Sequence, residues 1–265
     1  MQDTRTNSQR LRATIDLTAG PLSQRIYEFW THPQLGNLYP EFLFGLYGAV
    51  VASTPVIRQA AIEAERLSPS DCLAHRLAPY LHEHADEEQG HEEWLLEDLA
   101  VLGFDRDQVL NRLPYISVAS LVGSQYYLAR HVHPVAILGY IAVLENPASP
   151  EFLEGVAERN DLPIESMSTL LRHSRLDEGH VAEFDRMLDS LSLSPMQRDV
   201  MTASAIATVS NLEAFFTDVL EHFSRMVDGR SSDGIFYREP KPSASDVSDV
   251  ADRPKSGEFF HLAAV

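Results

Sequence analysis

Residues 81–94 read LHEHADEEQGHEEW, a run of histidines and carboxylates inside a segment whose apolar residues recur with a helical period. This segment is predicted to be helical over about residues 71–102. Within it, Glu88 and His91 form a Glu-x-x-His unit, and His84 offers a further ligand atom. Unpaired charged groups are costly to bury, so ligand-type side chains on a core helix indicate a partner such as a metal ion.

A second run of such residues, HSRLDEGH, occupies positions 173–180. Its members His173, Asp177 and His180 are spaced i, i+4 and i+7, so they lie within roughly 60° of one another on one helix face at about 100° per residue. Apolar residues continue the same stripe, which predicts that all three ligand-type side chains face the core. These apolar residues are Leu170, Phe184 and Leu188.

Glu145 is a further candidate ligand, because it ends the apolar run 135–144 where a solvated helix would place more polar residues. Bundle proteins hold two iron or manganese ions between helices that present carboxylates and imidazoles inward, including a lone Glu from the remaining core helices. Cys72 is the only cysteine, and a mixed imidazole and carboxylate set without thiolate favours iron or manganese over structural zinc. Six such ligands for two metals leave positions open for O₂ and substrate.

The rest of the chain is also predicted to be helical, which gives an all-α fold class. Pro55 is expected to kink or break one of the helices. The acidic residues between positions 92 and 98, Asp98 among them, are expected to be solvated. The expected helices cover about residues 23–31, 40–66, 71–102, 117–145 with an interruption near Pro134, 150–159, 163–190 and 195–227.

The chain of 265 residues has 39 acidic side chains against 21 Lys and Arg, a formal net charge of −18. This charge disfavours nucleic acid as a partner, because duplex binding depends on basic residues that neutralise phosphates. Residues 1–12 lack the apolar stretch of a secretory signal. The longest apolar runs are shorter than the roughly 18 residues that span a bilayer. We therefore expect a cytoplasmic protein without a membrane partner.

Composition divides the chain into two parts. Residues 1–228 are expected to form one helical domain that carries all the candidate ligands. Residues 229–265 are rich in Ser, Pro and charge, so they are expected to be a disordered or loosely docked tail.

Taken together, the stretch 84–103, the apolar segment ending in Glu145, and the His-x-x-x-Asp-x-x-His run at 173–180 resemble the haem-oxygenase-like di-iron oxidases, a family of iron-containing redox enzymes. The resemblance covers roughly residues 20–225. It implies a haem-oxygenase-like bundle of about seven helices, two iron ions and O₂ as co-substrate. It also implies oxidation of a small molecule such as an amino acid, amine or fatty acid, by N-oxygenation, C–C cleavage or decarboxylation.

Carried over residue by residue, the resemblance assigns all catalytic work to the metal ligands. The chain differs from some members of the family at position 84, seven residues before the ligand His91, where those members have a Glu and this chain has His84. Glu88 is therefore preferred as the ligand, with His84 and Glu87 as substitutes. A homodimer is compatible with these expectations. The implied iron ligands are Glu88, His91 and His173 for one ion, and Glu145, Asp177 and His180 for the other.

Two alternatives stay open at the level of sequence. A ferritin-like di-iron protein would use a similar ligand order with Glu63, but it has no role for an inward His173. A metal-free haem-oxygenase-like binding protein or thiaminase-type hydrolase would need a nucleophilic cysteine in its pocket, and Cys72 lies two to three turns before the candidate ligands.

Overall fold

The computed structural model describes residues 4–145 and 148–227, and for 176–178 and 223–227 it describes the helical backbone only. The expected tail, 229–265, lies outside these residues. Every regular element within them is a helix. The helices are α1 (Asn7–Thr18), α2 (Gly20–Trp30), α3 (Leu35–Leu67), α4 (Cys72–Glu87), α5 (His91–Val101), α6 (Arg106–Leu110), α7 (Ile116–His131), α8 (Ile137–Leu144), α9 (Pro150–Arg159), α10 (Ser168–Asp189) and α11 (Pro195–Val227), with 3₁₀ turns at Pro134–Ala136 and Ile164–Met167.

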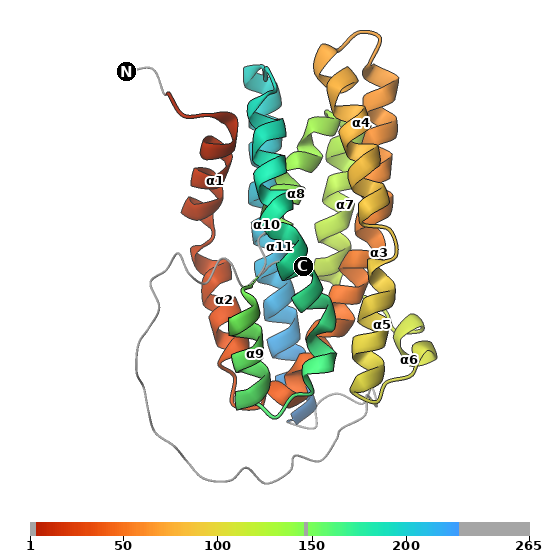
Figure 1. Ribbon diagram of the computed structural model, residues 1–265, viewed down its shortest axis with the longest axis vertical. Coiled ribbons are helices and arrows are strands. Elements are labelled where there is room, and N and C mark those ends of the chain that lie inside the picture. Colours follow the sequence, from red (N-terminus) through yellow and green to blue (C-terminus); the bar gives the residue numbers. More distant parts are fainter. Residues whose placement is uncertain (1–3, 146–147, 228–265) are drawn as a thin grey trace.

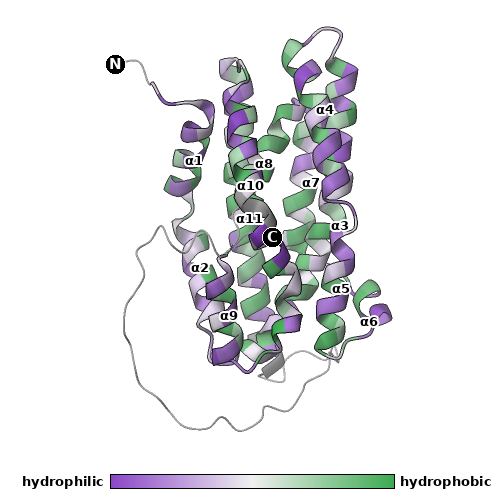
Figure 2. Cartoon of the chain, viewed as in Figure 1, coloured by the Kyte–Doolittle hydropathy of each residue, from purple (hydrophilic) through white to green (hydrophobic). Residues whose placement is uncertain are grey.

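The long helices lie side by side along one axis as an elongated bundle (Figure 1). Helix α3 contacts α4, α5, α7 and α11, and α11 contacts α1, α2, α7 and α8 in turn. Apolar residues follow the inward stripes of these helices, and polar residues face outward (Figure 2). The resulting core is one continuous cluster of buried side chains from α1 to α11.

Helix α3 runs through the middle of this bundle without a break. Pro55 lies inside it, so of the two expectations for Pro55, a kink or a break, the break is wrong. A proline removes one backbone hydrogen bond, to the carbonyl four residues earlier. Here that carbonyl belongs to Val51, an exposed residue, so water can satisfy it. By length and hydropathy α3 could also cross a membrane, but 56% of its most apolar window is buried inside the protein, as in the core helix of a bundle.

The segment expected as one helix over 71–102 is two helices. Helix α4 ends at Glu87, and α5 begins at His91. Between them Gly90 has a φ of 96°, in the left-handed region that glycine adopts without steric cost. Glu88 and His91 are therefore not an i, i+3 pair on one helix. Glu88 is the C-cap of α4, and His91 is the first residue of α5.

The bundle also has more helices than the expected seven or so, since eleven α-helices occur among the described residues. Two of the additional helices, α1 and α6, each begin with a capping box that is visible in the sequence. The N-caps are Thr6, paired with Gln9, and Asp105, paired with Gln108.

Helices α8 and α11 approach each other closely at Gly139. A Cβ atom added there would overlap the carbonyl oxygen of Met201 and lie 2.7 Å from the backbone nitrogen of Ala205. Only a residue without a side chain permits this contact between two backbones. The contact sets the position of α8, the helix that leads to Glu145.

Candidate metal centre

Three of the predicted ligands meet in the core where α4, α5 and α10 come together. Glu88, His91 and His173 each offer a ligand atom, and these atoms all lie within 4.8 Å of one another. Nδ1 of His91 is 3.1 Å from Oε2 of Glu88 and 3.1 Å from Nε2 of His173. Both histidines are buried. The break at Gly90 turns the chain so that the end of α4 and the start of α5 face the same point.

His173 is held in one orientation by its own helix. Its Nδ1 donates to the carbonyl oxygen of Thr169, at 2.9 Å, which leaves the lone pair of Nε2 facing the cluster. Burial lowers the pKa of His173, so the ring favours its neutral form. Neutral imidazole, fixed by a hydrogen bond from its other nitrogen, is the form in which histidine binds metals.

Glu88 supplies the negative charge of the cluster. Burial alone would raise its pKa, but the hydrogen bond from His91 and the neighbouring His84 and His173 lower the pKa overall. The backbone carbonyl of Glu88 accepts a hydrogen bond from Thr54 of α3, at 3.2 Å, which fixes the end of α4. One carboxylate and two imidazoles suit a divalent transition metal such as iron. The residues present therefore fit the implied metal.

Asp98 positions the start of α10, although it was expected to be a solvated surface residue. It is 0% exposed, so its expected place on the solvated surface is wrong. Its carboxylate accepts hydrogen bonds from Ser168 Oγ at 2.6 Å and from the Thr169 backbone N–H at 3.0 Å. An anion at a helix N-terminus is favourable, because the first N–H groups lack partners inside the helix. Asp98 thus anchors the turn whose Thr169 carbonyl orients His173.

We expect Asp98→Ala to destabilise the protein by about 1–3 kcal/mol, because it leaves buried donors at Ser168 and Thr169 unpaired. Urea unfolding monitored by circular dichroism measures this loss. The matched control is Glu97→Ala, which removes a carboxylate on the exposed face and should change stability by less than about 0.5 kcal/mol. Equal losses in the two variants would contradict the anchoring role of Asp98.

Two of the other predicted ligands, Glu145 and His180, line a second, smaller pocket. His84 Nε2 is 3.3 Å from Oε1 of Glu145, and both side chains are buried. His180 lines the same pocket as this pair. The side chain of Asp177 lies outside the described residues. The pocket is also lined by three carboxylates that the sequence argument did not assign to the second ion, Glu83, Glu87 and Glu183.

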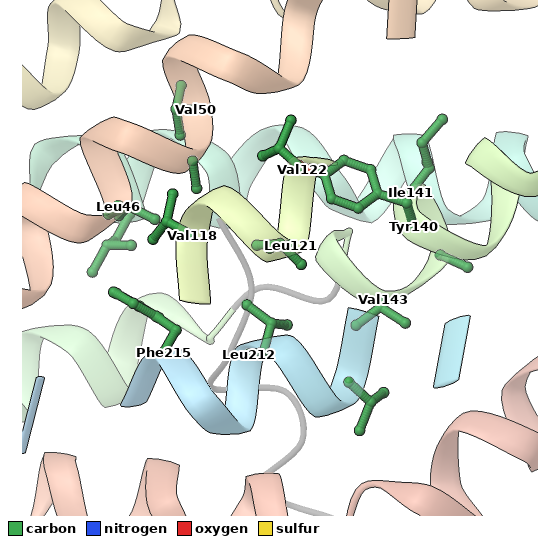
Figure 3. Packing of buried hydrophobic residues seen from close by; sticks show 14 of the residues in the cluster. Leu46, Val50, Val118, Leu121, Val122, Tyr140, Ile141, Val143, Leu212 and Phe215 are labelled. Atoms are coloured by element: carbon green, nitrogen blue, oxygen red, sulfur yellow. The ribbon is translucent and has the colours of Figure 1, made fainter. Parts of the chain in front are cut away.

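A larger and mostly apolar cavity lies on the other side of the His84–Glu145 pair. It comprises about 710 Å³ of space not filled by protein atoms, part of which is open solvent, and Glu88 lines it together with His84 and Glu145. Its apolar walls come from α3, α7, α8 and α11, whose side chains converge in Figure 3. The His84–Glu145 pair therefore separates an apolar cavity from an acidic pocket. The apolar lining residues are Phe42, Leu46, Ala49, Val50, Ile57, Val118, Leu121, Ile141, Leu144, Leu212 and Phe215.

A helical bundle that encloses a carboxylate–histidine cluster is typical of helical metalloproteins. Comparison with known proteins shows to which family of such proteins the chain belongs. Residues 64–210, more than half of the chain, match the family described as iron-containing redox enzymes. The chain belongs to this family. No match to a curated protein was found.

Solved structures show the same fold. A domain of unknown function with a haem oxygenase-like fold from Shewanella denitrificans OS217 superposes with a TM-score of 0.72 at 23% identity, over 86% of this chain and 96% of that chain. A TenA homologue from Pseudomonas syringae pv. tomato DC3000 gives 0.63 at 11% identity, over 80% and 92% of the two chains. A TenA homologue from P. horikoshii OT3 gives 0.55 at 16% identity, over 82% and 99%. The expected haem-oxygenase-like all-α fold is confirmed.

The fold and the cluster argue against the two alternatives, a ferritin-like di-iron protein and a metal-free binding protein or hydrolase. Glu63, which a ferritin-like site would use, instead accepts hydrogen bonds from Gln59 and Arg66 on its own helix. His173 takes part in the cluster, which a ferritin-like ligand set does not explain. Cys72 is exposed, and neither described pocket has a cysteine in its lining. The geometry thus favours a haem-oxygenase-like metal site over both alternatives.

Proposed function

We propose that the protein is an O₂-dependent non-haem di-iron oxidase or oxygenase that acts on a small metabolite. The observation that carries this proposal is the cluster of buried His91 and His173 with the half-buried Glu88, beside an apolar cavity. Iron(II) bound at such a cluster supplies electrons for the reduction of O₂. Membership of the iron-containing redox enzyme family supports the same chemistry.

In this proposal the two ions occupy different parts of the site. Glu88, His91 and His173 hold the first ion. Glu145, Asp177 and His180 hold the second, for which the pocket lined by Glu145 and His180 is the supporting observation. His84, a substitute ligand, borders both the cavity and this pocket, and its Nε2 is 3.3 Å from Oε1 of Glu145.

The chain's own residues contribute orientation and exclusion of water. Thr169 holds the ring of His173, and in the metal-free site the Glu88 carboxylate accepts a hydrogen bond from Nδ1 of His91, which keeps these two ligand atoms close together. The apolar walls of the cavity keep bulk water from a bound substrate, which strengthens electrostatic interactions at the reacting end. N-oxygenation, oxidative C–C cleavage and decarboxylation are the reactions that this arrangement could host.

We expect the reduced protein to bind close to two iron ions per chain, because five of the six candidate ligands lie, among the described side chains, at two adjoining places in one bundle. Anaerobic loading with iron(II), removal of excess metal and elemental analysis give the stoichiometry. Oxygen uptake by the loaded protein, measured against the metal-free protein, tests the reactivity. A stoichiometry that stays below one at complete loading would refute the di-iron proposal.

A further inference from the structure

We infer that Trp94 is a positioning residue of the metal cluster: its indole ring fixes the orientation of His91 and so raises the affinity of the cluster for its metal ion. Trp94 belongs to α5 and lies three residues after His91. It is not among the residues that the sequence predicted for the site. The inference concerns the first ion of the proposed function and rests on that function for its catalytic meaning.

The two histidines of the cluster are held in different ways. The ring of His173 donates from Nδ1 to the carbonyl oxygen of Thr169. His91 directs its Nδ1 to the cluster, and among the described residues its Nε2 has no hydrogen-bond partner. A metal-binding histidine almost always uses its second nitrogen in a hydrogen bond that fixes the ring. A contact other than a hydrogen bond from the protein must therefore orient His91.

The indole ring of Trp94 stacks on the imidazole ring of His91. The two ring centroids are 4.0 Å apart, and the ring planes are inclined by 23°. Residues three apart on a helix are neighbours, so α5 itself brings the two rings together. A rotation of the imidazole ring out of this plane would lose the stacked contact, which is favourable beyond the area that it buries. Stacking thus supplies the restraint that His91 lacks.

The same indole ring also contacts the second histidine of the cluster. Its centroid is 5.6 Å from that of His173, and the two rings are inclined by 62°. Trp94 therefore contacts two of the three ligands, and these come from two different helices. Since Trp94 is partly exposed while both histidines are buried, its ring lies on the solvent side of the cluster.

Arg172 holds the indole ring from α10. Its Cζ atom is 5.0 Å from the centroid of the Trp94 ring, a cation–π contact. Its Nη2 atom is 3.5 Å from Oε2 of Glu97 on α5, which restricts the guanidinium group. Arg172 directly precedes His173 in the sequence. The helix that carries one histidine ligand thus also holds the ring that orients the other.

The other tryptophan of the chain, Trp30, provides a matched control for a role in packing alone. Trp30 is buried, and its ring contacts Phe29, Phe42 and Phe152 in the aromatic part of the core. The same substitution can therefore be made at a tryptophan that only packs and at one that contacts the cluster. Loss of the indole ring should reduce stability at Trp30, and it should reduce metal affinity at Trp94.

Titration of the metal-free full-length protein with cobalt(II) tests the inference, because cobalt(II) binds the same imidazole and carboxylate ligands as iron(II). In Trp94→Leu the affinity for the first ion should fall about tenfold, a value common to the loss of a group that orients a ligand and to the loss of an aromatic pair. Trp94→Phe keeps a stacking ring and should stay within about threefold of the unaltered protein. Trp30→Leu should unfold at a lower urea concentration but keep its cobalt(II) affinity.

Two spectroscopic measurements detect a change at the cluster that loss of packing alone would not cause. In Trp30→Phe the only tryptophan is Trp94, and its fluorescence should be quenched as the first cobalt(II) binds, because its ring contacts two of the ligands. The ligand-field absorption of bound cobalt(II) should change in Trp94→Leu and return in Trp94→Phe. If Trp94→Leu does not fold, Trp94→Met replaces it, since methionine is also apolar and lacks a ring.

Unchanged cobalt(II) affinity and absorption in Trp94→Leu would overturn the positioning role, and so would an equal loss of affinity in Trp30→Leu. With iron-dependent oxygen uptake intact, either result would leave the proposed function standing. A cobalt(II) affinity that depends on Trp94, in a protein that takes up no oxygen when loaded with iron(II), would do the reverse.

Discussion

His173→Ala is expected to abolish metal binding at the Glu88–His91 cluster and to halve the iron content of the loaded protein. Loss of groups that only orient a ligand costs about 10–100-fold in metal affinity, and loss of the ligand itself should cost more than 100-fold. His173 supplies one of the three ligand atoms and, among the described side chains, is the only residue of α10 in the cluster. His173→Gln, which keeps much of the side-chain volume, separates loss of the ligand from loss of packing.

Equilibrium binding of iron(II) under anaerobic conditions, with elemental analysis and Mössbauer spectroscopy, measures this effect. Asp177→Ala and His180→Ala should deplete the second ion instead, because their helix positions lie farther along α10 at about 1.5 Å per residue. His131→Ala, on the exposed end of α7, is the control that should keep both ions. Retention of both ions and of full oxygen uptake in His173→Ala would refute the assignment at its most distinctive residue.

Gly139→Ala is expected to destabilise the protein by about 3 kcal/mol, at the upper end of the range for overpacked cores. The added methyl group would overlap the Met201 carbonyl oxygen and approach the backbone of Ala205. Backbone atoms of a long helix cannot move aside as a side chain can, so α8 must shift away from α11. This shift would also displace Glu145 from His84. The second site should therefore bind less iron, in addition to the loss of stability.

Thermal and urea unfolding of Gly139→Ala give the loss in stability, and Gly123→Ala is its matched control. Gly123 is also helical, on α7, and an added Cβ there meets no atom within 4 Å. Alanine at this position should therefore stabilise the protein by roughly 0.5–1 kcal/mol through its higher helix propensity. Similar effects of the two substitutions, in sign and size, would show that the α8–α11 contact is not tight.

Much of the fold could be predicted because local signals mark the helix ends. Pro150 and Pro195 stand at first-turn positions, and α9 and α11 begin at these residues as expected. The stripe shared by His173, Leu170 and Phe184 predicted a core-facing helix, and all three residues are buried. The helical periodicity of the sequence was therefore enough to predict which side chains face the core where one helix carries the whole pattern.

The remaining features depend on tertiary structure. A single glycine such as Gly90 is tolerated inside many helices, so the sequence alone did not reveal the break that brings Glu88 and His91 together. Pro55 stays within α3 because packing against the neighbouring helices outweighs one lost hydrogen bond. Asp98 could have been found by the same spacing as the ligands, since it lies seven residues after His91 on one face of α5.

The His84–Glu145 pair borders both the apolar cavity and the acidic pocket, which has a kinetic consequence. A substrate in the apolar cavity and the cation of the second site would each have a route of its own to this pair, so neither would have to pass the other. Binding of the two should then follow a random order of addition. Saturation with one should leave the association rate of the other unchanged, while dissociation rates report any coupling between them.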